Sequence, residues 1–585
     1  MENFYNRLRN FKLPKKNEIK LAISSFSKKE SLVFFGFVIL LIVSTVAILE
    51  FINLSFMVSI PTQGGSVSEG IIGTPRYVNP VLAFSDADDD MVSLVYSGLM
   101  RKDENSNLIP DLAEKYKVSP DGLSYTFTLK DDIYFQDGKP VTPEDIIFTV
   151  NEVKNPTVKS PKKTNWDGVN VEKIDDKTIK FTLKQPYSSF LENLTLGIIP
   201  EHLWINSPIE INDLNINPIG SGPYKFKSVS KESSGVINSY ELVAFNKFAL
   251  GKPFIENLTL HFYGNEQDLI SALLNGEVSQ ISSITPKNAE ILKEKNYLVE
   301  SSVLPRVFGL FFNQNQNQLF TDKSVIQAMN KAIDKDKIID EVLSGYGVVI
   351  DDPIPPNMTE YQRLSNENNA SQAQNIADAE AILAKDGWKK GSDGFLEKTT
   401  TVKKKKTTLQ LAFSISTSNA GELAKTADLI KQDLEAIGMK IDIKTFDVGN
   451  LNQYVIRPRK YDALLFGQII NHESDLFAFW HSSQRKDPGL NVAMYTNAKV
   501  DKILEDAFVT VDEKSRIKKY AQFEDEIKKD MPAVFLYSPK FIYVVSPNVQ
   551  GISLNHITSP ADRFGSSYLW YINTENVWKI FSKQN

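Results

Sequence analysis

The longest uninterrupted hydrophobic run in the chain lies near its beginning. Residues Leu32 to Leu49 contain no charged side chain, and Glu50 follows directly. As a helix, a run of 18 residues is about 27 Å long, close to the roughly 30 Å hydrocarbon core of a bilayer. We therefore predict a transmembrane anchor over residues 31–52. No later run is long enough for a second span.

The charges around this run predict its orientation. Residues 1–30 carry eight Lys or Arg against three Glu, although the whole chain has a formal net charge of −6. The positive-inside rule then places residues 1–30 in the cytoplasm and the acidic remainder outside. A cleaved signal peptide is the competing interpretation. Its hydrophobic region is usually about 7–15 residues, however, and the small-x-small pattern Thr45-Val46-Ala47 lies inside the run. Residues 53–70, which include PTQGGSVSEG, predict a flexible tether.

Beyond Gly70 the pattern alternates between strand and helix periods. YTFTLK at 125–130 has the period of a half-buried strand, and 135–139 forms a turn around Asp-Gly. Thr142-Pro143 and Thr285-Pro286 predict helix starts, with a hydroxyl cap and proline in the first turn. Apolar positions at helical spacing predict a third helix over 322–343, which Gly345 ends.

A strand–helix–strand pattern sets the fold class. Strand-like runs at 409–415 and 439–446 flank a predicted helix over 421–437. This spacing is typical of a βαβ unit and favours a mixed or parallel sheet, so the body is predicted to be α/β. Lys403 to Lys406 follow GFLEKTTTV and are interpreted as a solvated hairpin tip.

Composition excludes several chemistries. The chain has no cysteine, which excludes disulfides, thiolate nucleophiles, Cys-ligated zinc and a lipid-modified Cys. The acidic body gives no support for nucleic-acid binding. The five histidines show no short metal spacing, and no nucleophile-elbow or phosphate-loop motif occurs. Carboxylates are plentiful, so paired-carboxylate chemistry stays open by counting, but nothing singles out a pair.

Several segments, taken in order, resemble the family 5 extracellular solute-binding proteins, the peptide- and nickel-type receptors of ABC importers. The segments are GTPRYVNP at 73–80, VYSGL at 95–99, PDLAEKY at 110–116, SPDGLSYTFTLKDDIYFQDGKPVTPEDIIFTV at 119–150, PIGSGPY at 218–224, and the 312–334 and 381–388 regions. Together the match covers about residues 70–575.

The resemblance implies a two-lobed clamp of the type II periplasmic-binding-protein kind, preceded here by the transmembrane helix. In this family the ligand is enclosed between lobes by hinge closure. Mapped onto this chain, lobe I comprises 71–100, 217–303 and 535–585, an inserted domain comprises 101–216, and lobe II comprises 304–534.

The resemblance also implies ligand contacts. In the family's peptide binders the ligand lies extended against a cleft strand, which here corresponds to 461–468. The family's ammonium-binding Asp corresponds to Asn471, which carries no charge, and Glu473 or Asp475 could replace it. Phe477 and Trp480 are expected to pack within the lobe. The implied ligand-binding residues are Phe84, Ser85, Asp86, Phe308, Phe466, Gly467, Gln468, Ile469, Asn471, Glu473 and Tyr537.

The function implied by the resemblance is capture of oligopeptides by a membrane-anchored, extracytoplasmic receptor that delivers them to the permease subunits of an ABC importer. We expect a monomer at the cell membrane that is not an enzyme and has no catalytic residue, cofactor, metal site or nucleic-acid partner. The alternatives are a ligand-sensing receptor with a separate signalling partner, a binder of a non-peptide solute, and a surface hydrolase with paired carboxylates in the cleft.

Overall fold

The computed structural model describes residues 15–356, 358, 371–402 and 405–582. The chain divides into two compact units, which are described separately. The terminal unit combines residues up to Thr62 with those from Asn573, and the main unit comprises Gln63 to Ile572. Residues 573–585, which we predicted to belong to lobe I, are therefore grouped with the predicted anchor.

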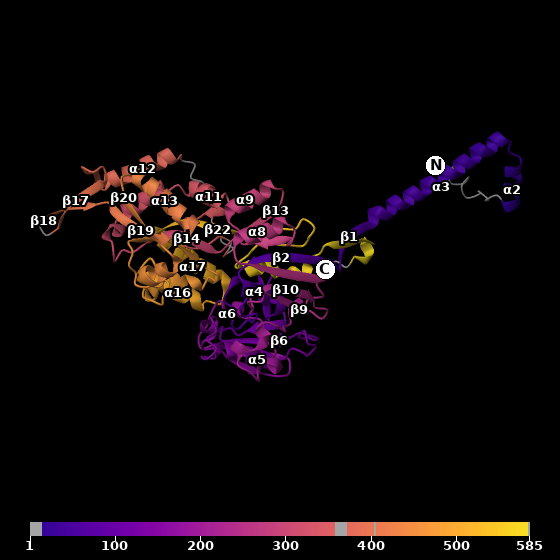
Figure 1. The fold of residues 1–585 in the computed structure, drawn as a ribbon, viewed down its shortest axis with the longest axis horizontal. Coiled ribbons are helices and arrows are strands. Elements are labelled where there is room, and N and C mark those ends of the chain that lie inside the picture. The colour runs from indigo at the N-terminus through magenta and orange to yellow at the C-terminus, as the bar shows by residue number, and fades with distance from the viewer. Residues whose placement is uncertain (1–14, 357, 359–370, 403–404, 583–585) are drawn as a thin grey trace, which may run out of the picture. The chain divides into compact units, whose positions relative to one another are not determined.

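The terminal unit is built on one long apolar helix. Helix α3 (Lys28–Phe56) follows the short helix α2 (Lys16–Ser24), and it begins at Ser27, whose hydroxyl accepts the Glu30 N–H. Among the described residues, α3 is the helix whose length and composition would allow it to cross a membrane, and none of its residues is buried. Strand β1 (Met57–Thr62) follows it and pairs antiparallel with β23 (Asn573–Trp578) (Figure 1).

This pairing corrects the predicted tether. Residues 57–62 form β1, and residues 66–70 lie in strand β2 (Ser66–Ile72) of the main unit. The Gly-rich composition suggested an unstructured segment, but Val67 is a buried strand residue. Residues 63–65 separate the two strands.

A large mixed sheet organises the main unit. Within the described residues it has twelve strands, and Figure 1 shows β19 and β20 toward one end of the unit, β9 and β10 toward the other, and β22 between them. The strands, in order across the sheet, are β20 (Lys440–Phe446), β19 (Ala412–Ser418), β21 (Ala463–Ile469), β14 (Arg306–Phe312), β22 (Ala533–Val545), β12 (Gln280–Ser282), β2, β11 (Asn257–Tyr263), β10 (Ile237–Ala244) and β9 (Tyr224–Lys231), while β13 (Leu298–Val303) and β15 (Gly347–Val349) also pair with β22.

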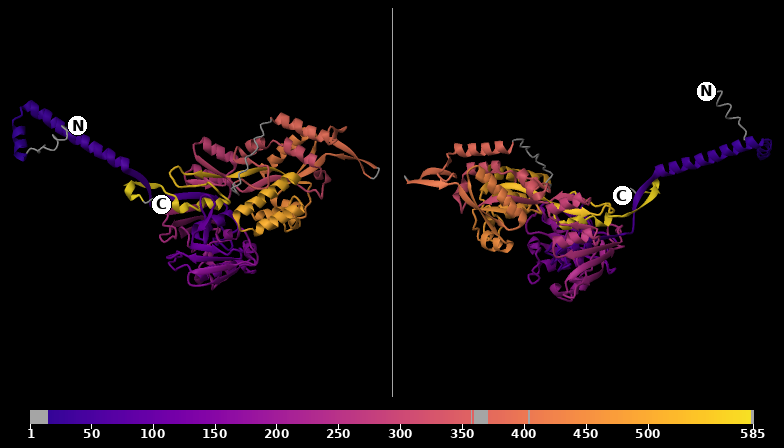
Figure 2. Two further views of the ribbon diagram at one scale, coloured as in Figure 1. Left: turned by 180° about the vertical axis from the view of Figure 1, so that it is seen from behind. Right: turned by 45° about the horizontal axis from the view of Figure 1, so that its top comes forward.

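Smaller sheets lie outside this one. They are β5-β6-β8-β7 (Ala113–Val118, Ser124–Leu129, Thr178–Thr182, Asn170–Lys173), β3-β4 (Met100–Lys102, Leu108–Pro110) and β16-β17-β18 (Lys389–Lys390, Leu396–Val402, Lys405–Gln410). The first lies within the predicted inserted domain. The β17–β18 hairpin extends from the body of the main unit in both views of Figure 2. Its tip, where we placed the lysine run, falls partly outside the described residues.

The main unit contains helices that pack against the large sheet and against the smaller sheets. They are α4 (Asp86–Val95), α5 (Pro143–Lys154), α6 (Phe190–Asn193), α7 (Glu201–Trp204), α8 (Glu266–Leu274), α9 (Pro286–Glu294), α10 (Lys323–Ala332), α11 (Lys335–Leu343), α12 (Gln372–Lys385), α13 (Gly421–Ala436), α14 (Val448–Asn450), α15 (Asp475–Trp480), α16 (Ala498–Val509) and α17 (Glu513–Asp530). Parallel strands β19 and β20 flank α13, so the predicted βαβ unit is confirmed. The predicted starts of α5 and α9 are confirmed as well.

Two predicted elements are interrupted. The helix expected over 322–343 is two helices, because Asp334 starts α11 by accepting the Lys337 N–H at 2.9 Å. The strand expected over 409–415 is divided between β18 and β19 at Leu411. At Asp334 a new helix begins, and at Leu411 the chain passes from the β16-β17-β18 sheet to the large sheet. The apolar period does not show either boundary, so periodicity alone merged neighbouring elements.

A buried charge cluster ties distant parts of the main unit together. The Arg563 guanidinium, in the turn Pro560–Phe564, donates to Glu69 on β2 at 2.7 Å and to both carboxylate oxygens of Asp90 on α4 at 2.7 and 2.8 Å. The Tyr543 hydroxyl on β22 donates to the second Glu69 oxygen at 2.7 Å. Burial raises the pKa of Asp90 to about 6, against the opposing charge of Arg563. The cluster therefore fixes α4 and β2 to β22 and to the turn Pro560–Phe564, which are far away in sequence.

Replacing Arg563 by Leu leaves two carboxylates buried without their cation. We expect the free energy of unfolding of the full chain in detergent micelles to fall by about 3–5 kcal/mol, as for other buried pairs that lose one partner. Urea denaturation followed by tryptophan fluorescence measures the loss. The control is Lys163→Ala, which removes one partner of the exposed Lys163–Asp167 pair and should cost less than about 1 kcal/mol. Equal losses would contradict the role assigned to Arg563.

Candidate functional site

An aromatic platform lies where strands β21, β14 and β22 run side by side. Phe308 on β14 is opposite both Gly467 on β21 and Tyr537 on β22. The rings of Phe308 and Tyr537 are stacked, with centroids 4.9 Å apart and 10° between their planes. A Cβ built on Gly467 would lie 2.6 Å from the Phe308 ring. The absent side chain at Gly467 thus lets the ring of Phe308 lie across the neighbouring strand.

One edge of β21 lacks a neighbouring strand over most of its length. Strand β19 pairs only with the first two residues of β21. On the other side, the Ile470 N–H donates to the Pro305 carbonyl at 2.9 Å. In an antiparallel ladder the residues that bond to the neighbour alternate with residues that face away. Gly467 and Ile469 therefore direct their backbone groups away from β14.

This edge offers donors and acceptors to an added strand. The Leu465 carbonyl, which faces the same way, accepts the Thr417 hydroxyl at 3.0 Å. Beyond it, Gly467 and Ile469 have no strand partner at this edge within the part of the chain that the structure describes. Unpaired strand edges are the places where extended peptides add to a sheet.

Strand alternation places two predicted site residues on the opposite face of the sheet. Phe466 and Gln468 point away from the aromatic platform, since side chains along a strand alternate. Phe466 packs against the hydrophobic cluster around α15, α16 and α17. Gln468 is 2 % exposed, and neither its amide nitrogen nor its amide oxygen has a hydrogen-bond partner among the described residues. A buried amide without partners costs about 1–3 kcal/mol.

The loop before α4 carries the first predicted contacts. Ser85 caps the helix, with its hydroxyl accepting the Asp88 N–H at 3.2 Å. Asp86 lies in the first turn, where the positive end of the helix dipole favours a carboxylate. The Phe84 side chain is 60 % exposed. Ser85 thus has a structural role, whereas Phe84 is free to contact a ligand.

Arg306 on the platform side lies within the electrostatic influence of Asp86 in this loop, although the sequence did not suggest it. It begins β14 opposite Ile469, on the same face as Phe308. Its Nε is buried without a hydrogen-bond partner among the described residues. Burial lowers the pKa of Arg306, and the charge of Asp86 opposes this. Asp86 and Arg306 therefore provide opposite charges beside the strand edge.

The loop after β21 makes contacts inside the protein. The Arg516 Nε donates to Glu473 at 2.5 Å, and both side chains are largely buried. Glu473 is thus already paired, which weakens the suggestion that it replaces the missing Asp. Asn471 is exposed. Trp480 is fully buried and packs against other aromatic rings, as expected.

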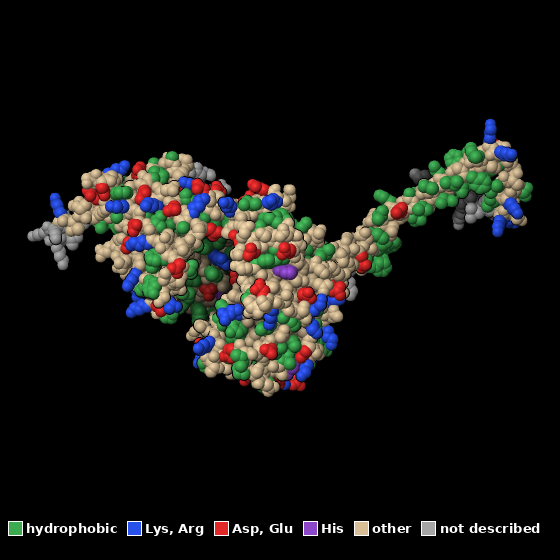
Figure 3. Space-filling model, in the orientation of Figure 1, with side chains coloured by type: hydrophobic (Ala, Val, Ile, Leu, Met, Phe, Trp, Pro, Cys, Tyr) green, Lys and Arg blue, Asp and Glu red, His purple; other side chains and the backbone are tan. Residues whose placement is uncertain are grey.

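This loop also contacts the predicted inserted domain. The His472 Nδ1 lies within hydrogen-bonding distance of Glu192 on α6. Nearby, the ring of Tyr187 stacks on that of Phe508, with centroids 5.0 Å apart, and the Ser188 N–H donates to the Phe508 carbonyl at 3.0 Å. These contacts join α6 and the residues before it to the loop before α15 and to α16. In Figure 3 a hollow with charged and apolar side chains opens between the surface over α16 and α17 and the surface over α4 and α6.

Comparison with known proteins shows the family of this chain. The model of the bacterial extracellular solute-binding proteins, family 5, matches residues 107–488. The chain belongs to this family. It is 29 % identical over 503 residues to the oligopeptide-binding protein AppA of Bacillus subtilis strain 168, covering 84 % of this chain and 89 % of that protein.

Solved structures agree with this solute-binding protein fold. AppA from Bacillus subtilis, in complex with a nonapeptide, has a TM-score of 0.65 at 28 % identity, covering 88 % of this chain and all of that one. NikZ from Campylobacter jejuni, in complex with Ni(L-His), has a TM-score of 0.67 at 28 % identity, covering 86 % and 99 %. The two-lobed α/β fold expected from the sequence is therefore confirmed.

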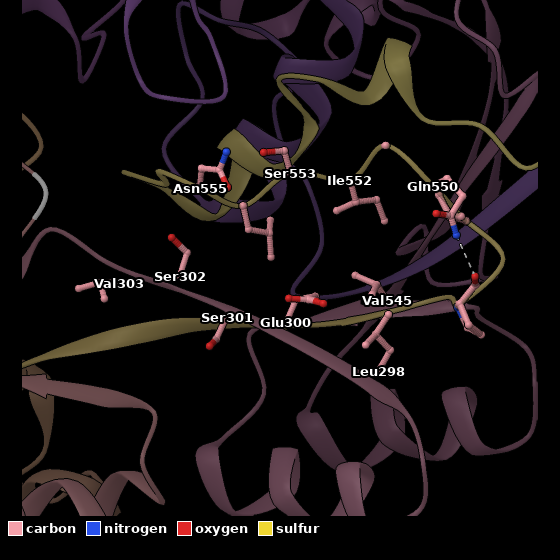
Figure 4. A pocket seen from close by; sticks show the side chains of 14 residues that line it. Leu298, Glu300, Ser301, Ser302, Val303, Val545, Gln550, Ile552, Ser553 and Asn555 are labelled. Carbon is pink, nitrogen blue, oxygen red and sulfur yellow. Dashed lines mark hydrogen bonds between the residues drawn. The ribbon is translucent and has the colours of Figure 1, made fainter. Parts of the chain in front are cut away.

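A separate pocket of this solute-binding protein contains none of the predicted site residues. Its volume is about 620 Å³, and Figure 4 shows Glu300 and Ser302 of β13 on the side of the strand that faces Ser553 and Asn555, whereas Ser301 points away. The pocket is largely polar and open, and the backbone edge of β21 lies elsewhere. Among the described residues, no group of three or more His, Asp or Glu side chains is placed to hold a metal ion.

The predicted residues thus fall into groups. The platform side of the sheet holds Phe308, Gly467, Ile469 and Tyr537, the opposite side holds Phe466 and Gln468, and loops hold Phe84, Ser85, Asp86, Asn471 and Glu473. Which of them contact ligand stays a prediction. The sequence could have suggested Arg306, because it is a charged residue at the start of an apolar strand. Its interaction with Asp86 could not be predicted, because the two residues are far apart in sequence.

The His472–Glu192 contact predicts a pH-dependent stability. Burial acts to lower the pKa of His472, but the hydrogen bond and charge of Glu192 outweigh it, so the pKa is raised above 6.5. The His472–Glu192 contact should stabilise the folded protein fully when the pH is below the ordinary histidine pKa of 6.5. This stabilisation should be lost as the pH rises through the raised pKa of His472. The melting-temperature difference between wild type and His472→Gln should therefore be largest below pH 6.5 and shrink as the pH rises above it.

The partner variant provides the control for this experiment. Glu192→Gln should remove the same pH-dependent increment, and the double variant should lose no more than either single one. Additive losses in the double variant would show that the two side chains do not act on each other.

Proposed function

We propose that this chain is a membrane-anchored, extracytoplasmic receptor that captures oligopeptides beside β21 and delivers them to an ABC importer. The observation that carries the peptide assignment is the unpaired backbone edge at Gly467 and Ile469. An extended peptide can pair with these groups through its own backbone, whatever its side chains are. The family supports a receptor rather than an enzyme.

The surroundings of this edge suit peptide side chains of different kinds. The stacked rings of Phe308 and Tyr537 offer an apolar surface, while Asp86 and Arg306 offer one charge of each sign. On the other face of the sheet, the buried amide of Gln468 has no hydrogen-bond partner among the described residues. Backbone pairing with a few such contacts gives affinity without narrow sequence specificity.

The recognised peptide need not present a free amino terminus. Asn471 carries no charge, so it can accept a hydrogen bond but provides no ion pair. Glu473 is paired with Arg516 inside the protein. We therefore propose that the peptide is held by its middle or has a blocked terminus. AppA, whose structure holds a nonapeptide, is compatible with a long ligand.

The anchoring part of the proposal is supported by α3. It is apolar, has no buried residue and is preceded by basic residues, as expected for a span with a cytoplasmic amino-terminal side. The chain has no cysteine, so a lipid on cysteine is not available as an anchor. Receptor and importer would then share one membrane.

Mass spectrometry of the ligand that co-purifies with the full chain tests the function. The chain is solubilised in detergent, washed, and denatured to release its ligand. A heterogeneous set of peptides is the expected result. A single non-peptide compound, such as a metal chelate, would overturn the peptide assignment while leaving the solute-binding fold intact. An unwashed sample and an unrelated membrane protein serve as controls.

Ile469→Pro tests the strand edge directly. Proline removes the edge N–H, for which the described residues offer no partner, so the fold should persist. Binding of a peptide identified by mass spectrometry should weaken by about tenfold or more in calorimetry, since one hydrogen bond and the edge geometry are lost.

Two neighbouring variants control this experiment. Ile469→Val keeps the N–H and should bind like wild type. Gln468→Pro removes an N–H that faces β14 and should destabilise the protein instead. Unchanged affinity in folded Ile469→Pro would show that ligands do not pair with this edge.

A further inference from the structure

A second group of apolar side chains lies beside the end of α3 in the terminal unit. Antiparallel pairing of β1 and β23 brings Trp578 opposite Met57, the first residue after the helix. The Trp578 indole N–H donates to the Asn53 side chain at 2.6 Å. The chain after Trp578 continues as the turn Lys579–Phe581. The antiparallel register thus returns β23 to the helix end.

The position of Asn53 gives the depth of this group if α3 spans a bilayer. Glu50 marks the end of the uncharged run, and Asn53 follows three residues later. Three helical residues advance about 4.5 Å along the axis. The interfacial zone on each side of the hydrocarbon core is about 5–8 Å thick. The Trp578 indole therefore lies at the level of the lipid headgroups.

The side chains at this level are unusually apolar for a surface exposed to water. Trp578 is 44 % exposed, Ile580 77 % and Phe581 73 %. Leu54 and Phe56 of α3 are each 60 % exposed and continue the apolar surface. Lys579 lies between Trp578 and Ile580 in the sequence. Tryptophan is enriched at membrane interfaces because its ring is apolar and its N–H is polar, and lysine can reach the phosphates.

We propose that Trp578, Ile580 and Phe581 form a second membrane contact, inserted into the outer interface of the bilayer that α3 crosses. This proposal rests on the proposed anchoring. The occupant is lipid because the exposed side chains continue the surface of a helix that has no buried residue. The terminal unit then has two contacts with the bilayer, a span and an interfacial segment, joined by the β1–β23 pairing.

The tryptophans of this chain make the proposal measurable. The chain has six, and five lie in the main unit with 0–3 % exposure, namely Trp166, Trp204, Trp388, Trp480 and Trp570. Lipid-borne quenchers should therefore reach Trp578 alone. The full chain is reconstituted into vesicles of phosphatidylcholine and phosphatidylglycerol, with bromine placed at different depths along the acyl chains.

The expected result is loss of part of the tryptophan emission, strongest with bromine near the glycerol end of the chains. Trp578→Phe should abolish this lipid-quenched component. The double variant Ile580→Ser with Phe581→Ser keeps the tryptophan and should reduce its quenching. Quenching by an aqueous quencher should rise correspondingly in the double variant.

Extraction at alkaline pH separates failure of this proposal from failure of the anchoring proposal. If the chain resists extraction but Trp578 is not quenched by lipid, the interfacial contact is wrong and the anchor stands. If the chain is extracted, both proposals fail. If quenching persists unchanged in the double serine variant, Ile580 and Phe581 do not hold the segment in the interface, and the proposal fails in that form.

Discussion

The candidate site depends on one strand that belongs to both parts of the large sheet. Strand β22 pairs with β14 and β15 through its first half and with β12 and β13 through its second half. Its side chains also enter several different hydrophobic clusters. The Leu304 N–H donates to the Pro539 carbonyl, so the connection into β14 crosses beside β22. Any change of register in β22 would displace Tyr537 from Phe308 and the platform with it.

What this scaffold presents to a ligand is largely backbone. Gly467 lets the Phe308 ring lie across the sheet, and at the edge of β21 its backbone groups have no strand partner among the described residues. A site of this kind has few side chains that a motif search could find. It also explains why a chain with ordinary composition and no catalytic motif still builds a binding surface. Receptors that accept varied peptides need this type of contact more than they need fixed charged groups.

The sequence predicted the fold well because its signals were local or came as ordered motifs. Proline and hydroxyl caps located α5 and α9, and the βαβ unit followed from period and length. The break before Asp334 was missed because a capping side chain interrupts a continuous apolar stripe. The site was predicted less completely. Strand alternation sends Gln468 to the other face, and the approach of Asp86 to Arg306 depends on chain segments about 220 residues apart in sequence. Such contacts have no local signal.

Pairing of β1 with β23 changes how the receptor is connected to its anchor. The sequence predicted one flexible tether of 18 residues, 53–70, which would allow excursions of roughly 25 Å. In the structure the main unit joins the terminal unit through both of its ends, Gln63 and Ile572. Only residues 63–65 separate β1 from β2, and Gly64 and Gly65 make backbone hydrogen bonds to the segment 254–257. A shorter link raises the effective concentration of one binding partner near another. Under the proposed function, this connection keeps the receptor close to the membrane in which its importer lies.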